Sequence, residues 1–187
     1  MESDNLAPGL LLAMPQLSDP NFSRAVVLMI EHGDQGSFGL VINHPSPIKA
    51  TELLESLELS WRGDDRAVVW AGGPVSPSTG WVLHEPIGSA QPGQGGTIEI
   101  TSTISLSTSP DRLRAIASSP PRNIRLLLGY SGWGPGQLAA EMASGAWLHT
   151  AADPGLVFDT PADEMWEAAM KKLGIDPRDL FTSRGVN

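Results

Sequence analysis

The Gly129–Gln137 stretch is the part of the sequence whose residue types come closest to a known chemistry. It reads Gly-Tyr-Ser-Gly-Trp-Gly-Pro-Gly-Gln and lies between an apolar run, Ile124–Leu128, that predicts a buried strand and a segment, Gln137–Ala143, that predicts a helix. Backbone amides at the start of a helix bind anions, so this turn could hold a phosphate or an oxyanion. The competing interpretation, which we favour, is a tight turn with positive φ angles and Trp133 as a packing plug.

None of the common nucleotide or hydrolase motifs fits this stretch. No Lys-Ser/Thr pair follows it, so it is not a Walker loop, and the G-x-G-x-x-G spacing of dinucleotide sites is absent. The G-x-S-x-G motif of serine hydrolases fails because Trp133 occupies the position of the final glycine. A triad of Ser131, a histidine and an acid can be drawn, but almost any chain of this size permits one.

A second glycine-rich segment, Ala71–Val75, could present backbone amides as an anion-binding nest. A turn that ends a strand explains the same residues. If both glycine-rich segments contribute to one site, the ligand lies between them. The candidate ligand-binding residues are Gly72, Gly73, His84, Tyr130, Ser131, Gly132, Trp133 and Gln137.

The histidines provide no support for a metal site. His32, His44, His84 and His149 have no H-E-x-x-H or comparable spacing, and the chain has no cysteine, so thiolate zinc sites and disulfides are excluded. Each histidine lies at or near the end of a predicted strand, where a hydrogen-bonded structural role is expected. We therefore expect no metal, no cofactor and no catalytic residue.

The elements that must position these residues are short strands and helices in mixed order. Ala25–Glu31 and Phe38–Asn43 predict two strands joined by a hairpin connection at His32–Gly36, and Ala50–Leu57 predicts a short helix. Connections of hairpin length favour antiparallel pairing. The expected fold class is α+β, with a mixed, mostly antiparallel and partly barrel-like sheet and helices packed on it.

Two helices have clear start signals. Ser109 is the expected N-cap of one, with Pro110 at its first position. Thr160 is the expected N-cap of the last helix and Pro161 its first residue. The expected buried stripe of that last helix is Met165, Trp166, Ala169, Met170 and Leu173.

Length and composition favour one globular domain over residues 1–187, with a core of about 6–180, a flexible loop at Ser89–Gly96 and a loose tail at Ser183–Asn187. The formal net charge of −9 repels phosphate backbones, which argues against direct binding of nucleic acid. The first residues lack the pattern of a signal peptide, and the apolar runs are too short to span a bilayer. A cytoplasmic location follows as the expectation.

The order of four blocks of sequence resembles the YqgE/AlgH family of uncharacterised bacterial proteins, from about Leu6 to Leu180. The blocks are Pro8–Pro15 with Asp19–Arg24 and Phe38–Asn43; Gly72–Val75 with Gly80–His84; Leu128–Trp133 with Gly136–Leu138 and Ala146–Leu148; and Phe158–Pro161 with Trp166 and Leu173–Ile175. The resemblance implies an α+β fold and a bacterial cytosolic protein. It supplies no catalytic or ligand residues, and its label of transcriptional regulator of alginate synthesis has no mechanism attached. The family usually has alanine at the position of Ser131, which further weakens a serine nucleophile there.

Three functional hypotheses remain open at this stage. The first, which the abundance of Gly, Pro and Trp favours, is a non-catalytic binding or regulatory domain with an unknown small molecule or protein as its partner. The second is a small hydrolase or transferase that uses Ser131 or His84, with the glycine-rich amides as an anion hole. The third is direct DNA binding, which the negative charge and the lack of a helix-turn-helix pattern oppose. The oligomeric state is open.

Overall fold

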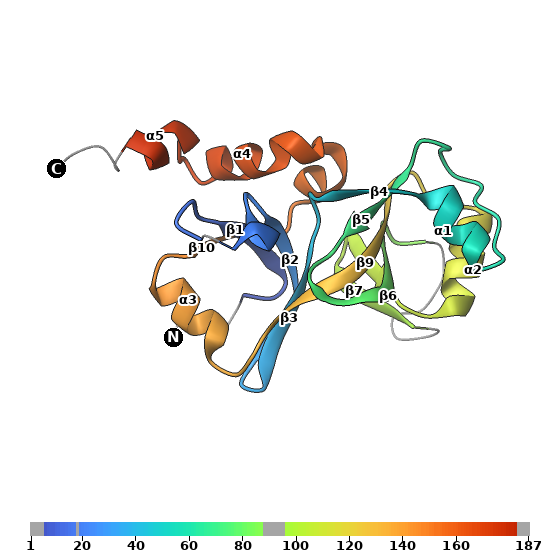
Figure 1. The fold of residues 1–187 in the computed structure, drawn as a ribbon, viewed down its shortest axis with the longest axis horizontal. Coiled ribbons are helices and arrows are strands. Elements are labelled where there is room, and N and C mark those ends of the chain that lie inside the picture. The colour runs from blue at the N-terminus through green and yellow to red at the C-terminus, as the bar shows by residue number, and fades with distance from the viewer. Residues whose placement is uncertain (1–5, 18, 88–95, 183–187) are drawn as a thin grey trace. The chain divides into compact units, whose positions relative to one another are not determined.

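The computed structural model describes residues 6–17, 19–87 and 96–182 (Figure 1). The expected tail and nearly all of the expected Ser89–Gly96 loop lie outside these ranges. Contacts divide the chain into two compact units. Unit 1 comprises residues 1–43 and 131–187, and unit 2 comprises residues 44–130. The single domain expected from chain length stays a prediction.

Unit 1 is built on an antiparallel sheet with the strand order β10-β1-β2-β3-β9. Its strands are β1 (Gly9–Ala13), β2 (Val26–Gly33), β3 (Gly36–Val41), β10 (Trp147–Thr150) and the end of β9 (Ile124–Trp133). Its helices are α3 (Gln137–Ala143), α4 (Ala162–Lys172) and α5 (Pro177–Thr182), with a 3₁₀ turn at Pro20–Phe22 and a π-helical turn at Gly155–Asp159. Figure 1 shows α3 and α4 on opposite sides of β1, which explains why all five residues of β1 are buried.

Unit 2 contains a mixed sheet with the strand order β7-β8-β6-β9-β5-β4. Its strands are β4 (Pro45–Lys49), β5 (Val68–Ala71), β6 (Val75–His84), β7 (Thr97–Thr101), β8 (Ile104–Ser107) and the first part of β9. Only the β5–β9 pair is parallel among the described strands. In Figure 1 this sheet curls like part of a barrel, and α1 (Ala50–Ser56) and α2 (Pro110–Ser118) lie together beside it. The expected α+β class and mostly antiparallel sheet are confirmed.

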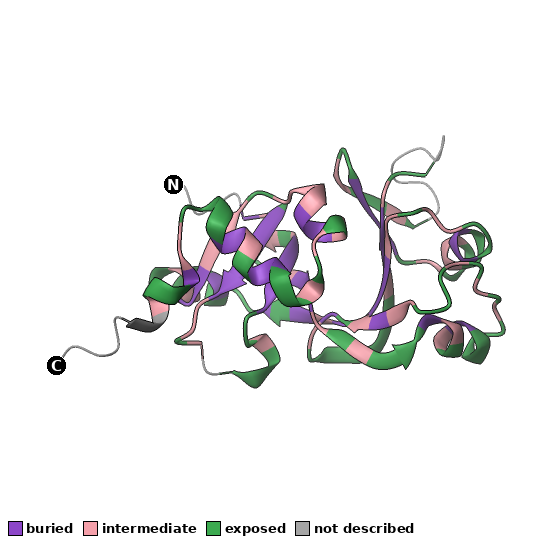
Figure 2. Ribbon diagram, turned by 90° about the horizontal axis from the view of Figure 1, so that it is seen from above, coloured by how far each residue is buried: buried purple, intermediate pink, exposed green. Residues whose placement is uncertain are grey.

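Each unit buries its own apolar cluster. In unit 2, α1 and α2 pack on the sheet through Leu54, Ile116 and Ala117, which contact Val82 and Leu126 of β6 and β9. Figure 2 shows buried residues along the strands, whereas the loops and the outer sides of the helices are exposed. In the described ranges, no helix has the length and apolar character needed to cross a bilayer.

The largest difference from the sequence prediction concerns β9. The expected strand at Ile124–Leu128 continues through Trp133, so most of the expected Gly129–Gly136 turn is a strand. Gly129 accommodates this with φ = 78° and Gly136 alone makes the left-handed turn before α3, with φ = 76°. The prediction treats the glycines as turn formers, although Gly129 and Gly132 lie within a strand, and at Gly129 another backbone approaches closely.

Of the two predicted helix N-caps, one is confirmed and one is wrong. The Ser109 hydroxyl accepts the Arg112 amide at 3.2 Å and Pro110 begins α2, as predicted. For α4 the predicted N-cap was wrong, because Thr160 donates its hydroxyl to the Gly155 carbonyl at 3.0 Å. The helix begins at Ala162, one residue later than expected. Four members of the predicted stripe are buried, whereas Leu173 ends the helix and is exposed.

Candidate functional site

Gly73 and Gly129 bring the two glycine-rich segments together inside unit 2. A Cβ atom on Gly129 would lie 2.4 Å from the Gly73 carbonyl oxygen, so the two backbones touch. The Gly72 amide donates to the Leu128 carbonyl at 2.8 Å, and Val75 pairs with Tyr130 in the sheet. The two backbone segments are in direct contact at Gly73 and Gly129. The Gly72 amide already donates a hydrogen bond across this contact, so it is not a free donor for an anion.

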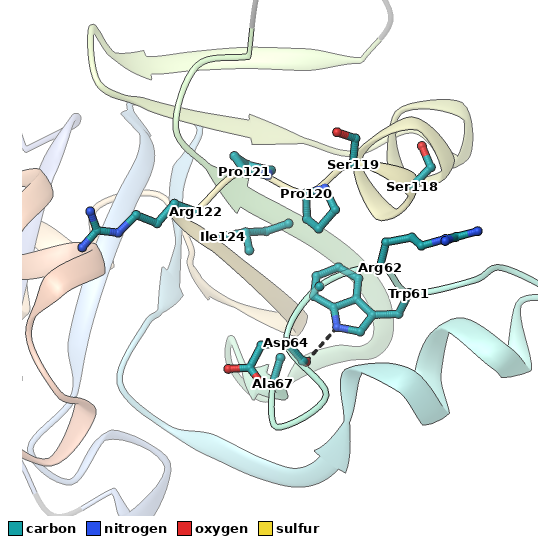
Figure 3. Close-up of a pocket in the computed structure, with 11 residues that line it drawn as sticks. Trp61, Arg62, Asp64, Ala67, Ser118, Ser119, Pro120, Pro121, Arg122 and Ile124 are labelled. Atoms are coloured by element: carbon teal, nitrogen blue, oxygen red, sulfur yellow. Dashed lines mark hydrogen bonds between the residues drawn. The ribbon is translucent and has the colours of Figure 1, made fainter.

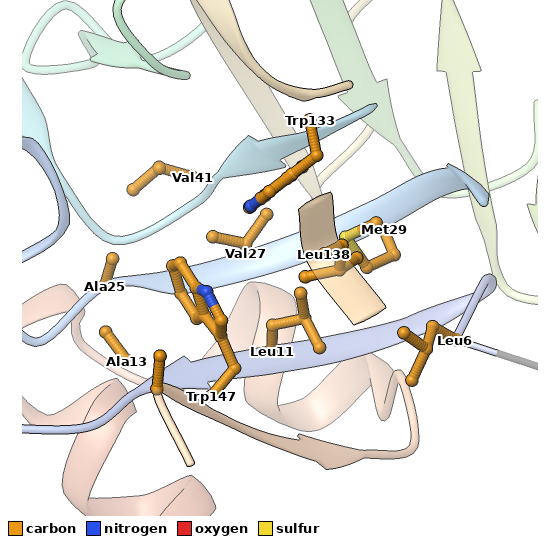
Figure 4. Close-up of a cluster of buried hydrophobic side chains, with 11 residues drawn as sticks. Leu6, Leu11, Ala13, Ala25, Val27, Met29, Val41, Trp133, Leu138 and Trp147 are labelled. Carbon is orange, nitrogen blue, oxygen red and sulfur yellow. The ribbon is translucent and has the colours of Figure 1, made fainter. Parts of the chain in front are cut away.

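Trp133 lies in the core of unit 1, as the packing interpretation predicted. Its side chain is 6% exposed and belongs to a buried cluster (Figure 4). The Trp133 ring stacks on Phe22 with centroids 6.3 Å apart and meets Trp147 edge-on at 5.8 Å. Burial of this extent leaves little ring surface for a ligand.

The carboxylate of Glu141, in α3, accepts hydrogen bonds from the polar groups around that core. Its Oε2 accepts the indole N–H of Trp133 at 2.9 Å and that of Trp147 at 2.8 Å. Its Oε1 accepts a hydrogen bond from the side-chain amide nitrogen (Nε2) of Gln137 at 3.2 Å, and the side-chain oxygen (Oε1) of Gln137 accepts the Gly134 backbone N–H at 3.0 Å. These hydrogen bonds hold α3 against the sheet. The Gly134 backbone amide belongs to the turn that was considered for anion binding, but it already donates to the Gln137 side chain.

The two remaining candidates of this stretch are Ser131 and Gly132, which lie in strand β9. Ser131 pairs with Gly39 of β3 and is buried, whereas Gly132 pairs with Phe38 and is exposed. Ser131 lines neither the cavity of about 340 Å³ nor the cavity of about 720 Å³ in unit 2. These positions therefore serve the sheet of unit 1.

His84, the candidate of unit 2, takes part in a chain of side-chain hydrogen bonds. Its Nε2 lies 2.8 Å from the Ser107 Oγ, and its Nδ1 lies 2.6 Å from the Glu85 carbonyl oxygen. The Ser107 Oγ lies 2.9 Å from the Thr97 Oγ1, which accepts the Arg112 Nε–H at 2.9 Å. His84 is 2% exposed and Ser107 is 1% exposed, so the chain is shielded from bulk water.

Burial lowers the pKa of His84 below its ordinary value of 6.5, against the hydrogen bond to Glu85, which raises it. Arg112 lowers it further, and the Glu85 charge opposes that effect. The folded state therefore favours the neutral ring near pH 7. Because a carbonyl oxygen only accepts, the proton of the neutral ring is on Nδ1, and Nε2 is left as a base facing Ser107.

This shift predicts that the free energy of unfolding decreases as the pH falls below about 6.5. Above that pH the ring is neutral in both states; below it the unfolded state binds a proton that the folded state does not, until the folded pKa is reached. The slope from one such group is at most about 1.4 kcal/mol per pH unit. Urea unfolding between pH 7.5 and 5.5 measures it, with His84→Gln as the comparison. Equal slopes for both proteins would contradict the assignment.

A cavity of about 340 Å³ opens beside this chain of hydrogen bonds, and Ser107 belongs to its wall. We call it the leucine cavity. It lies among α1, α2 and the strands β6 and β9, within unit 2. Its apolar lining is Leu53, Leu57, Leu59, Trp81, Val82, Pro110, Leu113, Leu126, Leu127 and Leu128, and its polar lining includes Ser78, Ser107, Thr108, Ser109 and Arg114. A mostly apolar wall with a few polar groups is typical of a small-molecule site.

A larger cavity of about 720 Å³ lies between residues 61–67 and 118–124 (Figure 3). The indole N–H of Trp61 donates to the Asp64 carbonyl at 2.9 Å and fixes the shape of the loop. The cavity contains Arg62 and Arg122, but in Figure 3 their side chains extend away from each other. Two guanidinium groups in this arrangement do not clamp one anion, so we assign no site here.

Sequence reasoning identified His84 but missed its partner Ser107 and the leucine cavity. A signal was present, because polar and apolar residues alternate at Thr97–Thr101 and again at Ile104–Ser107, where Ser105 and Ser107 fall on one face. The pairing of that face with His84 depends on strand register, which no local pattern specifies. No group of three or more metal-ligating side chains occurs within the described ranges.

A sequence comparison decides which family these elements belong to. The AlgH-like family matches residues 10–178, almost the whole described chain. The chain belongs to the AlgH-like family. The resemblance found in the sequence blocks is thereby confirmed.

Relatives and solved structures agree with this assignment. The chain is 42% identical to a UPF0301 protein of Myxococcus xanthus over 98% of this chain and 99% of the relative. It is 40% identical to one of Chromobacterium violaceum over 99% of both. The solution structure of the AlgH protein from Pseudomonas aeruginosa matches with a TM-score of 0.74 and 39% identity, covering 97% of this chain and 95% of AlgH. Protein DIP2367 from Corynebacterium diphtheriae shares the fold, with a TM-score of 0.70 at 20% identity over 89% of this chain and 86% of its own.

Proposed function

We propose that this AlgH-like chain is a binding domain for a small amphipathic molecule, held in the leucine cavity of unit 2. The observation that supports this most directly is the composition of the cavity wall, where leucine side chains surround a space of about 340 Å³. That volume is within the range of about 300–1,000 Å³ that small-molecule sites occupy. The leucine cavity takes the place of the region of the Gly72–Val75 and Gly129–Gln137 loops, where the sequence predicts the ligand.

The polar lining indicates the kind of ligand. Arg114 is exposed and lies in the wall of the cavity, with the hydroxyl-bearing residues Ser78 and Ser109. An apolar body would contact the leucines while an anionic end group met Arg114. A carboxylic acid with a medium-length alkyl chain has this chemistry. The cytoplasmic location and the regulatory role that family resemblance implies remain proposals, as does the absence of direct DNA binding.

Gly80 offers a direct test of the leucine cavity. A Cβ atom on Gly80 would lie 3.9 Å from the Leu128 Cδ2, in ordinary contact, so a valine fits the strand and fills space in the cavity. We expect octanoate at a hundred times its dissociation constant to raise the unfolding midpoint of the wild type by roughly 5–10 °C. Gly80→Val abolishes this rise. Differential scanning calorimetry measures it.

Thr79→Val is the matched control, because it places the same side chain on the neighbouring, exposed position of β6. This variant keeps the octanoate effect. Arg114→Gln weakens binding of octanoate but leaves binding of octanol unchanged, because only the acid carries a charge. An equal response of Gly80→Val and the wild type would refute the cavity as the site.

A second function, hydrolysis or group transfer, is favoured by one specific observation, the hydrogen bond between His84 and Ser107. The version that uses Ser131 lacks comparable support, because Ser131 pairs with Gly39 in the sheet of unit 1 and does not belong to the wall of the leucine cavity.

A further inference from the structure

We propose that Ser107 is a nucleophile activated by His84, and that it accepts a short apolar acyl group from an ester or thioester bound in the leucine cavity. The inference rests on the proposed function, since the acyl chain must enter that cavity. It adds a reaction to the binding site. No motif in the sequence marks it, because Ser107 and His84 are 23 residues apart and meet only through the β6–β8 pairing.

The hydrogen-bond chain permits one consistent direction of donation when His84 is neutral. The Glu85 carbonyl can only accept, so Nδ1 of His84 donates to it and Nε2 accepts the Ser107 hydroxyl proton. Ser107 then accepts from Thr97, and Thr97 accepts from Arg112, whose guanidinium can only donate. Every hydroxyl in the chain gives one hydrogen bond and receives one. The Ser107 proton thus points to a base, as in an activated serine.

Access to this serine is possible from one side. Ser107 is 1% exposed and belongs to the wall of the leucine cavity, so the carbonyl of a molecule in the cavity would meet its hydroxyl once a neighbouring side chain of the wall moves aside. The leucines of the wall would contact the acyl chain.

The reaction is balanced without any redox partner. As the Ser107 oxygen forms a bond to the acyl carbon, its proton moves to Nε2 of His84. The bond from the acyl carbon to the alcohol or thiol breaks, and the leaving group takes the proton from His84. Water then gives a proton to His84 and its oxygen to the acyl carbon, which releases the acid, and Ser107 regains the proton. The overall reaction is hydrolysis of the ester or thioester.

Covalent labelling tests the nucleophile directly. The full-length chain is incubated with an alkyl fluorophosphonate, which labels activated serines, and its intact mass is measured. We expect one adduct, mapped to Ser107, in the wild type and none in Ser107→Ala. Ser105→Ala is the matched control, since Ser105 is buried on the same face of the same strand, and it keeps the adduct. An unlabelled wild type, or an adduct that survives Ser107→Ala, overturns the proposal.

The absence of cysteine from the sequence allows a second, independent measurement. In Ser107→Cys the new thiol is the only one in the protein, so its alkylation by iodoacetamide at pH 6 reports its activation. A thiol paired with His84 reacts at least roughly tenfold faster than the thiol of Ser105→Cys. Adding His84→Gln to Ser107→Cys removes the advantage. Similar rates for the three proteins contradict the pairing.

Thr97 acts as a positioning residue, and its role is separable from stability. Thr97→Val removes the hydroxyl that orients Ser107, and we expect fluorophosphonate labelling to slow at least roughly tenfold. Thr97→Ser restores the hydroxyl and restores the labelling rate. A purely structural role would leave the rate the same in all three proteins, which would contradict this assignment.

The two proposals can fail separately. Octanoate binding that Gly80→Val abolishes, together with an unlabelled wild type, refutes the nucleophile and supports the binding domain. Labelling of Ser107 that Gly80→Val leaves unchanged, with no octanoate binding, refutes the leucine cavity as the ligand site. Loss of both octanoate binding and labelling in Gly80→Val supports both.

Discussion

Trp133→Ala is expected to lower the free energy of unfolding by about 3–5 kcal/mol, the range for removing a buried aromatic side chain. The substitution removes two aromatic contacts, with Phe22 and Trp147, and leaves a cavity in the core of unit 1. It also removes one of the two indole N–H donors of the Glu141 carboxylate. Urea unfolding followed by far-ultraviolet circular dichroism measures the loss without relying on tryptophan fluorescence.

Trp133→Phe is the graded control for this prediction. It keeps an aromatic ring in the core but removes the hydrogen bond to the Glu141 carboxylate, which is worth about 1.5–3 kcal/mol. The expected order of stability is therefore wild type, Trp133→Phe, Trp133→Ala. A loss below about 1 kcal/mol for Trp133→Ala would mean that this side chain is not a packing plug, and the region would again be open as a ligand site.

Gly129→Ala is expected to destabilise unit 2 far more than an ordinary glycine replacement. Two costs add at this position: a φ of 78°, which L-residues adopt at about 1–2 kcal/mol, and a Cβ atom 2.4 Å from the Gly73 carbonyl oxygen. Relief of that overlap requires the two backbones to separate, which stretches the hydrogen bond between the Gly72 amide and the Leu128 carbonyl. Thermal and urea unfolding measure the effect.

Gly136→Ala separates the two costs. Gly136 has nearly the same φ, 76°, but a Cβ atom there meets nothing within 4 Å. The free energy of unfolding of Gly136→Ala therefore decreases only by the conformational cost, about 1–2 kcal/mol. The difference in the free energy of unfolding between Gly129→Ala and Gly136→Ala measures the cost of the steric overlap with the Gly73 carbonyl oxygen. Equal losses would show that Gly73 and Gly129 do not touch.

The fold was predictable where local patterns are strong. The hairpin from β2 to β3, helix α1 and the Ser109 cap of α2 follow from alternation, helical spacing and capping chemistry. The Gly129–Gly136 segment was predicted as a turn because glycine favours both turns and close backbone contacts. Only the approach of Gly73, from 56 positions earlier in the chain, decides between them.

The candidate site was less predictable than the fold. Tyr130, Ser131 and Trp133 looked functional because their residue types are unusual, and the structure accounts for them by strand pairing and packing. His84 was identified, but Ser107 was not, because two separate strands must align in the correct register to join them. A site whose residues come from different strands cannot be recognised from residues that are neighbours in the sequence.

The division of unit 1 into two segments constrains how the protein is made. Strand β1 pairs with β10, and the Ala13 carbonyl accepts the indole N–H of Trp166, a contact between residues 153 positions apart. At a synthesis rate of about 5–20 residues per second, the partner of Ala13 emerges from the ribosome roughly 8–30 s later. Unit 2 is one uninterrupted stretch and is fully synthesised before unit 1 has all its strands. The nascent chain thus holds the apolar β1 unpaired on one edge for most of its translation, which makes this strand edge prone to aggregation during biosynthesis.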